Sequence, residues 1–430
     1  VNLDNTGSGS AITLSSDGTS LLLNGTAVGG GSANAVPTTT VPVSGQTNNW
    51  TIAIGENVLI NVDNNKSANV GIGYGTLELA EDVRTTVAVG GSALRNNGTT
   101  TSAWQNTAIG VSAGSNVTGG TNNIFMGYNC GGAISGGGDN VIIGAEAYLD
   151  KTGSSTQANV VIGYQAGKGS TVASPQEQVL IGRYAGRFSG SGIIAIGDSA
   201  ALSGTGGGAS IAIGVRALGQ SGHIRNIAIG QYALLNAGST AQENVGMGYY
   251  ALKELTTGDQ NTAVGTEALR DVTTGISNTV IGAFAGQRNT TPSSNTFIGR
   301  NSGSEITTGA KNTILGRFNG NSGGLDIRTS DNNIVLSDGD GNPRVYVDGS
   351  GNLMLGKIET AQQTAGTVLY NSGQIYNTAS GTHPLVLTRK TNDGALALFY
   401  KDTTEVARIG VAGGQGFIHG AGTDTGIFFG

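Results

Sequence analysis

The chain has 430 residues, of which 75 are glycine and only 12% are charged, and its formal net charge is −6. Nucleic acids bind to strongly basic surfaces, which an acidic chain with so few charges does not offer, so we expect no nucleic-acid partner. No apolar run is long enough for a membrane helix, and one cysteine cannot form an internal disulfide framework. We therefore expect neither membrane insertion nor a disulfide-stapled fold.

The N-terminal part divides into two short segments. Residues 1–29 contain two apolar runs on either side of SSDGTS, which predicts a β-hairpin with Asp17 and Gly18 in its turn. Residues 30–48 mix Gly, Ser, Thr and two prolines, a composition typical of a linker or an irregular collar. Because the chain begins with Val1 and not with methionine, we expect it to be a processed product or part of a longer polypeptide.

Residues 49–320 repeat one phrase sixteen times, with a strand-like triplet before a glycine. The repeat glycines stand at 55, 73, 90, 110, 127, 144, 163, 182, 197, 214, 230, 248, 265, 282, 299 and 316. Their spacing is close to seventeen residues, and a fixed period of this size indicates a stacked array. Apolar residues do not recur at helical spacing, so we predict an all-β protein, a parallel β-solenoid of about sixteen 17-residue coils.

The triplet before each glycine has two apolar faces. The residue three before the glycine is β-branched in all sixteen copies, and the residue one before it is Ile, Val, Met or Leu. We predict that these two columns point into the core of each coil, because strand side chains alternate. The middle column, which includes Phe125 and Phe297, holds no polar residue and would then face outward. A strand with two apolar faces needs a cover, so we predict a homotrimer that forms through the middle column.

Three other columns of the repeat carry structural predictions. Asn stands four residues before the glycine in eleven copies. Stacked coils would place these amides in a ladder. Alternatively, each Asn serves only as a turn residue. The repeat glycine itself marks a bend that only glycine reaches cheaply. Ala stands three residues after the glycine in eleven copies and predicts a second short strand. Cys130 falls in this alanine column, so we expect a small buried core residue.

The part after the array alternates short strands with Asp-Gly and Gly-Asn turns. We predict a β-hairpin neck over residues 321–380 and an antiparallel β module over residues 381–430, which ends in an apolar run and is therefore expected to continue in the authentic polypeptide. Asp338, Asp340 and Asn342 have the alternating oxygen atoms of a calcium loop. No bidentate acid follows at the right distance, so we favour a hairpin turn there.

We find no catalytic, cofactor-binding or metal-binding residues in the sequence and expect no enzyme. The three histidines, His223, His383 and His419, lie in different segments and belong to no triad or zinc motif. A β-solenoid glycan hydrolase would need acids stacked in neighbouring coils, but Glu146 and Glu267 are flanked in their column by Asn, Gln, Tyr or Phe. The hydrolase is therefore a distant alternative.

Aromatic residues gather in the two columns after the glycine. They form either a surface on which sugars stack or a set that packs over neighbouring loops, and both interpretations stay open. The residues are Tyr74, Tyr128, Tyr164, Tyr184, Tyr232, Tyr249, Tyr250, Phe284 and Phe318.

The repeats resemble two related groups of proteins. The copies NTAIGVSAG, NVVIGYQAG, NTAVGTEAL and NTVIGAFAG resemble the head repeats of trimeric autotransporter adhesins and, more closely, the NTAIGxxAG arrays of bacteriophage tail fibres. The stretches NNIVLSDGDGNPRVYVDGSGNLMLG and THPLVLTRKTNDG are similar to segments that follow such arrays in phage tail proteins. The resemblance covers about residues 49–430 and implies a left-handed parallel β-roll of three chains, without a catalytic residue to carry over. The period here is longer than in the autotransporter heads, so we expect longer coil loops.

The resemblance favours a phage tail fibre, an extracellular part of the virion tail that attaches to the host cell. It implies a homotrimer, other virion tail proteins as partners, and a glycan or protein receptor on the host surface. A bacterial trimeric surface adhesin is the alternative, and the absence of stalk heptads and membrane-anchor strands argues against it. Since packing explains the constant columns, we expect the array to act as a spacer, with recognition in variable loops or beyond the array.

Overall fold

The structure is a computed structural model of the chain. It describes residues 2–3, 12–16, 21–23, 26–27, 52–58, 68–99, 103–150, 156–169, 176–187, 190–203, 208–220, 225–238, 240–420 and 426–429. The predicted linker 30–48, the turn at Asp17 and Gly18, and His223 lie outside these ranges. The chain divides into two units, Val1–Asn342 and Pro343–Gly430. The described residues contain no helix, so the prediction of an all-β protein is confirmed.

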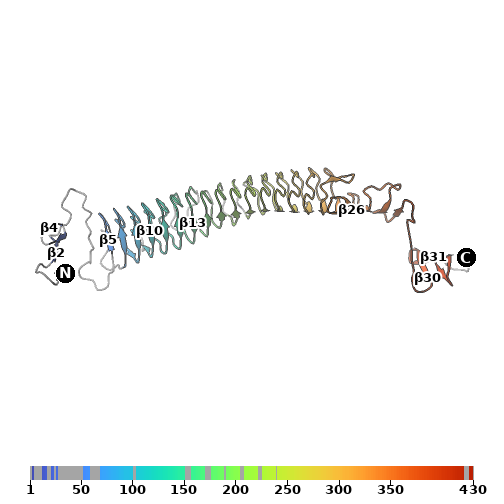
Figure 1. Ribbon diagram of the computed structural model, residues 1–430, viewed down its shortest axis with the longest axis horizontal. Coiled ribbons are helices and arrows are strands. Elements are labelled where there is room, and N and C mark those ends of the chain that lie inside the picture. Colours follow the sequence, from blue (N-terminus) through green and yellow to red (C-terminus); the bar gives the residue numbers. More distant parts are fainter. Residues whose placement is uncertain are drawn as a thin grey trace. The chain divides into compact units, whose positions relative to one another are not determined.

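The first unit is a parallel β-solenoid. One three-residue strand precedes each repeat glycine, and each strand pairs in parallel and in register with the strand of the next coil, as Thr107 does with Ile124. Figure 1 shows these strands side by side in a row. They are β5 (Ile52–Ile54), β6 (Val70–Ile72), β8 (Val87–Val89), β10 (Thr107–Ile109), β11 (Ile124–Met126), β12 (Val141–Ile143), β13 (Val160–Ile162), β14 (Val179–Ile181), β15 (Ile194–Ile196), β16 (Ile211–Ile213), β17 (Ile227–Ile229), β18 (Val245–Met247), β19 (Thr262–Val264), β20 (Thr279–Ile281), β21 (Thr296–Ile298) and β22 (Thr313–Leu315).

The ladder continues one strand past the predicted end of the array at residue 320. Strand β25 (Ile334–Ser337) pairs in parallel with β22. Shorter strands lie elsewhere in this unit: β7 (Val83–Arg84) pairs in parallel with β9 (Ala103–Trp104), and β23 (Asn321–Ser322) pairs antiparallel with β24 (Leu325–Asp326). At the N-terminal end, strands β1 (Asn2–Leu3), β2 (Ile12–Ser16), β3 (Leu21–Leu23) and β4 (Thr26–Ala27) form an antiparallel sheet, and β2 pairs with β3 as a hairpin requires.

The second unit contains two antiparallel sets of strands. Strands β26 (Pro343–Val347), β27 (Leu353–Leu355), β28 (Gly366–Leu369) and β29 (Ile375–Thr378) pair in sequence order. Strands β30 (Gly394–Lys401), β31 (Thr404–Ala412), β32 (Gln415–Gly420) and β33 (Gly426–Phe429) form a four-stranded meander. The prediction of small antiparallel elements after the array is confirmed.

The two faces of the array strands are exchanged relative to the prediction. The middle column is fully buried in the core of the coil, including Phe125 and Phe297 at 0% exposure. The columns on either side of it are half-buried or exposed, and Ile281 on β20 is 42% exposed. The predicted alternation is therefore correct, but the prediction that the middle column faces outward is wrong. The outer face of the sheet carries the β-branched column and the Ile, Val, Met or Leu column.

Side-chain volumes explain why the middle column belongs inside. The residue four after the repeat glycine faces the middle residue of the strand across the coil. A Cβ atom added to Gly131 would lie 2.4 Å from the Phe125 ring, and one added to Gly303 would lie 2.7 Å from the Phe297 ring. Elsewhere a small middle residue is matched by a side chain of the neighbouring coil, since a Cβ atom on Gly246 would lie 3.1 Å from Leu234 of the preceding coil. The interior of the stack is close-packed, so a large side chain at one position is matched by a small residue beside it.

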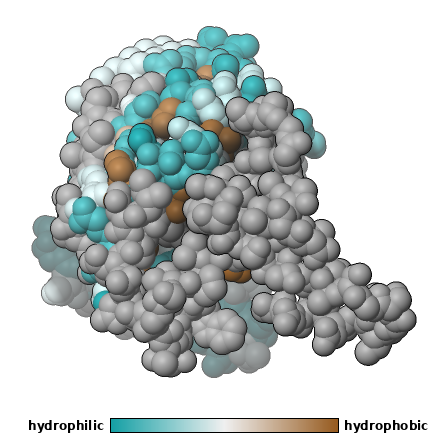
Figure 2. All heavy atoms as spheres, turned by 90° about the vertical axis from the view of Figure 1, so that its left-hand side faces the viewer, coloured by the Kyte–Doolittle hydropathy of each residue, from teal (hydrophilic) through white to brown (hydrophobic). Residues whose placement is uncertain are grey.

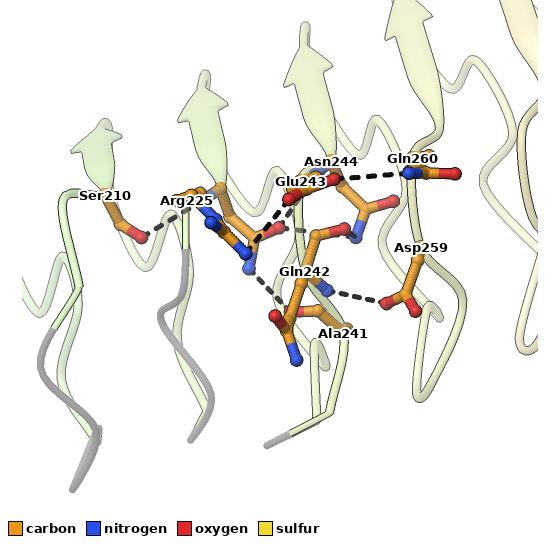
Figure 3. A network of polar contacts seen from close by, with 9 residues as sticks. Ser210, Arg225, Ala241, Gln242, Glu243, Asn244, Asp259 and Gln260 are labelled. Carbon is orange, nitrogen blue, oxygen red and sulfur yellow. Dashed lines mark hydrogen bonds and ion pairs between the residues drawn. The ribbon is translucent and has the colours of Figure 1, made fainter.

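The asparagine column forms a buried ladder along the array, which confirms the first of the two interpretations. Asn106 Oδ1 accepts hydrogen bonds from both the backbone N–H and the side-chain amide of Asn123, each at 3.0 Å. Asn106 Nδ2 donates to the carbonyl of Gly120 at 2.9 Å, so the amide is fully used. Figure 3 shows the same ladder around Asn244, where Ser210 takes the place of one Asn. Neighbouring coils that carry these polar residues are therefore tied together by side chains as well as by the strands, and the ladder is interrupted where Ile193 takes the place of the asparagine.

The repeat glycine is required by both its backbone angle and its neighbour. Gly265 has φ 137°, a conformation that residues with a side chain rarely adopt. A Cβ atom there would lie 2.5 Å from the carbonyl of Gly282 in the next coil. The residues after the glycine form a run of turns, so the predicted second strand is absent from the described coils. The alanine column in these turns is buried, including Ala268 and Ala285.

The ladder predicts a large effect of truncating one asparagine. In the Asn261→Ala variant, the backbone and amide donors of Asn278 lose their acceptor, and buried unsatisfied groups cost about 1–3 kcal/mol each. We expect a loss of about 2–4 kcal/mol in the free energy of unfolding, measured by denaturant titration. The matched control is Thr256→Ala, which removes an exposed hydrogen bond to the carbonyl of Thr273. Equal losses in the two variants would contradict a structural role for the ladder.

The glycine column predicts a second stability difference. Gly265→Ala adds a methyl group against backbone atoms of the next coil at a strained φ, and we expect a loss of about 3 kcal/mol or more, or failure to fold. Gly339→Ala is the control, because no heavy atom lies within 4 Å of its added Cβ atom. Thermal unfolding of both variants measures the difference, and a Gly265→Ala melting temperature equal to that of the control would refute the steric argument.

Candidate functional site

The two columns after the repeat glycine lie at a corner of each coil and carry the exposed aromatic residues. The second residue after the glycine has a left-handed backbone, as in Tyr184 (φ 60°) and Tyr232 (φ 59°). Of the nine aromatic residues singled out in the sequence, Phe318 is fully buried and belongs to the core. Tyr74 and Tyr128 are 61% and 54% exposed. The corner therefore presents aromatic rings to solvent.

Two groups of tyrosines form along this corner. Tyr164 and Tyr184, in adjacent coils, meet edge to face with ring centroids 5.6 Å apart. Tyr232 stacks on Tyr250 at 5.1 Å, and Tyr249 lies 4.0 Å from Tyr250. Aromatic pairs at these separations attract each other, so each group forms a firm platform. The rings pack on those of neighbouring coils, as the second interpretation expects, and the sugar-stacking interpretation stays a prediction.

Between the two tyrosine groups the corner is hollowed. This hollow, here called the Tyr-Arg groove, has a volume of about 540 Å³. Its lining comes from four consecutive coils, and three of its members are arginines. The lining residues are Arg183, Tyr184, Arg187, Asp198, Ser199, Leu202, Val215, Arg216 and Tyr232.

The charges of the Tyr-Arg groove are partly paired. Arg183 donates to Asp198 Oδ2 from Nε at 2.8 Å and from Nη2 at 2.6 Å. The Ser199 hydroxyl, which donates to Asp198 Oδ1 at 2.7 Å, and the Arg183 guanidinium together lower the pKa of Asp198. Asp198 is therefore ionised at neutral pH. The guanidinium groups of Arg183 and Arg187 lie 5.3 and 5.4 Å from the ring of Tyr184, within cation–π range.

Arg216 is an exposed cation of the groove, as Arg183 is, but it differs from Arg183 in having no carboxylate partner in the described part of the chain. It makes no ion pair or side-chain hydrogen bond with any residue that the structure describes, and it acts on Asp198 only through its charge. Three guanidinium groups against one carboxylate give the groove a positive excess, although the whole chain is acidic. The arrangement can hold a small anion-bearing ligand against tyrosine rings.

The acids singled out for a hydrolase do not form a catalytic pair. Glu146 pairs with Lys168 and accepts a hydrogen bond from Gln165 at 2.8 Å, and the hydrogen bond from Lys168 lowers the pKa of Glu146. A general acid needs a raised pKa, so a carboxylate with a lowered pKa is not suited to this role. Glu267 accepts from Arg270 at 2.7 Å and is likewise held by a cation.

The other residues singled out in the sequence are placed apart. Cys130 is buried, its Sγ lies 3.3 Å from the carbonyl oxygen of Gly127, and burial raises the pKa of its thiol to about 12. The prediction that Cys130 is a core residue is confirmed. His383 is exposed before β30, and His419 on β32 pairs with Arg408 on β31.

The loop at Asp338 is a turn, as predicted. Asp338 Oδ1 accepts backbone hydrogen bonds from Asp340 at 3.0 Å and Asn342 at 2.9 Å, which are the contacts of an Asx turn. Within the described ranges, no three His, Cys, Asp or Glu residues gather as metal ligands would. The described part of the chain also has no helix with the length and apolar character needed to cross a membrane.

Comparison with known proteins gives no match. Neither protein-family models nor curated proteins nor solved structures match this chain. The site therefore has to be judged from its own residues. Sequence analysis identified the tyrosines of the corner but missed Arg183, Arg187 and Arg216. Alignment of the two columns after each glycine would have placed Arg183 and Arg216 beside the tyrosines of neighbouring coils.

The buried thiol predicts slow alkylation of Cys130. The thiolate is the reactive form, and a pKa of about 12 leaves little thiolate at pH 8.5. We expect iodoacetamide to label the native chain at least about a thousandfold more slowly than the chain in guanidinium chloride, where the pKa returns to about 8.5. Mass spectrometry of timed samples measures both rates. Similar rates in the two conditions would show that Cys130 is accessible.

Proposed function

We propose that this chain is a subunit of a bacteriophage tail fibre, which assembles as an elongated homotrimer and attaches the virion to its host cell. The observation that carries the proposal is the outer face of the array sheet. The column one before the glycine is Ile, Val, Met or Leu in every coil, and the column three before it is Ile or Val in eleven coils and Thr in the other five. Two columns form it, and exposed members in adjacent coils include Ile281 (42%), Ile298 (41%) and Leu315 (39%). We call this surface the outer stripe.

The length of the outer stripe favours a second copy of the chain as its cover. Strands spaced by ~4.8 Å over sixteen coils give a stripe about 75 Å long. Contiguous exposed apolar surfaces of this extent mark interaction sites in soluble proteins. Since every copy would present the same stripe with the same coil spacing, identical chains can cover one another in register. The number three comes from the resemblance of the repeats to trimeric arrays.

The face that we assign to the subunit contact differs from the sequence prediction. The middle column cannot form the contact because it is buried inside the coil. The two columns beside it take this role, and the sequence argument that a strand with two apolar faces needs a cover applies to them unchanged.

The proposed partners follow from this role. They are two further copies of the chain, other virion tail proteins, and a glycan or protein receptor on the host surface, with the fibre in the extracellular tail of the virion. A bacterial trimeric surface adhesin is the alternative, because it would use the same outer stripe. We propose no enzymatic activity, since the half-buried acids Glu146 and Glu267 are held by cations.

Antibody labelling separates the fibre from the adhesin. Antibodies against the chain should decorate the tails of virus particles in electron micrographs if it is a fibre subunit. Decoration of bacterial envelopes in uninfected cells would favour the adhesin proposal over the fibre proposal.

The outer stripe predicts which substitution dissociates the subunits. We expect light scattering to give three times the chain mass of 43.0 kDa for the unmodified protein and a lower mass for Ile281→Asp, because the substitution places an unpaired charge in the contact. The matched control is Ile276→Asp, since Ile276 is similarly exposed (46%) but lies outside the strand. Circular dichroism checks that both variants stay folded. A soluble, folded monomer of the unmodified chain would contradict the proposal.

A further inference from the structure

We propose that the Tyr-Arg groove binds an acidic saccharide, a sugar chain that carries carboxylate groups. The proposal deepens the attachment function, because it places a recognition site on the array that the sequence analysis expected to be only a spacer. It rests on four features of the groove: its size, its platforms of tyrosine rings, its exposed guanidinium group and its ionised acid.

The groove has the dimensions of a ligand site. Its volume of about 540 Å³ lies within the range of about 300–1,000 Å³ that is typical of small-molecule sites. Its lining comes from the coils of Gly182, Gly197, Gly214 and Gly230, which span roughly 14 Å at the strand spacing. An extended ligand of a few rings can lie along it.

The tyrosines supply flat apolar surfaces at both ends of the groove. Tyr184 is braced by Tyr164 at one end, and Tyr232 is braced by Tyr250 at the other. Sugar rings present C–H faces, which pack on aromatic rings, and hydroxyl groups at their edges. A ring held in a fixed orientation loses little conformational entropy when such a ligand binds.

The polar groups of the groove match an acidic sugar. A guanidinium group presents a planar fork of N–H donors that fits a carboxylate, and Arg216 has no competing ion pair within the described residues. Asp198 is held in place by Arg183 and Ser199 and remains an acceptor for sugar hydroxyls. A neutral sugar would leave Arg216 without a partner, so the groove favours an acidic one.

Two other occupants fit the groove less well. A long polyanion such as a nucleic acid needs a continuous basic track, whereas the corner also carries acids, such as Asp198 in the groove and Glu267 further along the array. A second copy of the chain has the outer stripe as its apolar contact, and the groove lies at the corner, in the columns after the glycine. The polar lining of the groove therefore suits a hydrated ligand.

Calorimetry of the purified full chain tests the proposal. We expect a tetragalacturonate probe to bind, and a neutral galactose tetrasaccharide to bind at least about tenfold more weakly. Arg216→Gln should weaken the binding of the acidic probe at least about tenfold. Arg300→Gln, which removes an equally exposed arginine from a distant coil, should leave the binding unchanged. Equal binding of the two probes, or an equal loss in the two variants, would overturn the proposal.

A second measurement needs no substitution. Phenylglyoxal modifies accessible arginines, and mass spectrometry locates the modified residues. The acidic probe should protect Arg216 and not Arg300 in the unmodified protein. Absence of protection overturns the site even if a variant fails to fold.

The oligomeric state separates this proposal from the fibre proposal. If the chain forms trimers that do not bind the acidic probe, only the saccharide proposal is wrong. If the chain is a folded monomer, the fibre proposal is wrong, and the binding measurement alone decides the saccharide proposal. If Arg216→Gln lowers the mass in light scattering, the groove is a subunit contact and the saccharide proposal is wrong.

Discussion

The contact between one coil and the next is the constraint on which the rest of this structure depends. From Gly55 to Gly299, each repeat glycine lies against the glycine carbonyl of the following coil, and asparagines in adjacent coils bond to one another, as Asn106 does to Asn123. Both contacts require neighbouring coils in strict register. Residues inserted between coils must therefore loop away from the stack: β12 and β13 pair in register although their asparagines, Asn140 and Asn159, are nineteen residues apart.

Register fixes the backbone positions along the stack, and the side chains of each region then have to fill the interior. A large side chain such as Phe125 is accepted because Gly131 of the same coil faces it, and Leu234 is accepted because Gly246 of the next coil leaves room for it. Close packing is thus achieved within a coil and between neighbouring coils. Stability is then roughly a sum of coil and neighbour contributions, and no single central core decides it. The exposed columns are free to vary without disturbing this packing.

The exposed surface of a coil divides into two chemically distinct parts. The outer stripe has one continuous column of Ile, Val, Met and Leu beside a β-branched column, which suits contact with an identical stripe that has the same period. The corner after the glycine varies from coil to coil, so a local group of residues such as Arg183, Arg216 and Tyr232 can form there without a counterpart elsewhere. A fibre built in this way combines uniform assembly with one local recognition site, which is the relation between our two proposals.

The sequence by itself determined the all-β class, the repeat, the strand before each repeat glycine and the burial of Cys130, because each depends on contacts that recur at one spacing. The asparagine ladder was one of two interpretations that the sequence left open, and the second strand that it predicted is absent from the described coils. Only the tertiary structure decided which face of the strands lies inside. Alternation separates two faces but does not say which of two apolar faces is the core, and that choice depends on the volume that faces a residue such as Phe125 across the coil. The Tyr-Arg groove likewise required the structure, since its residues come from four consecutive coils and meet only because the coils stack.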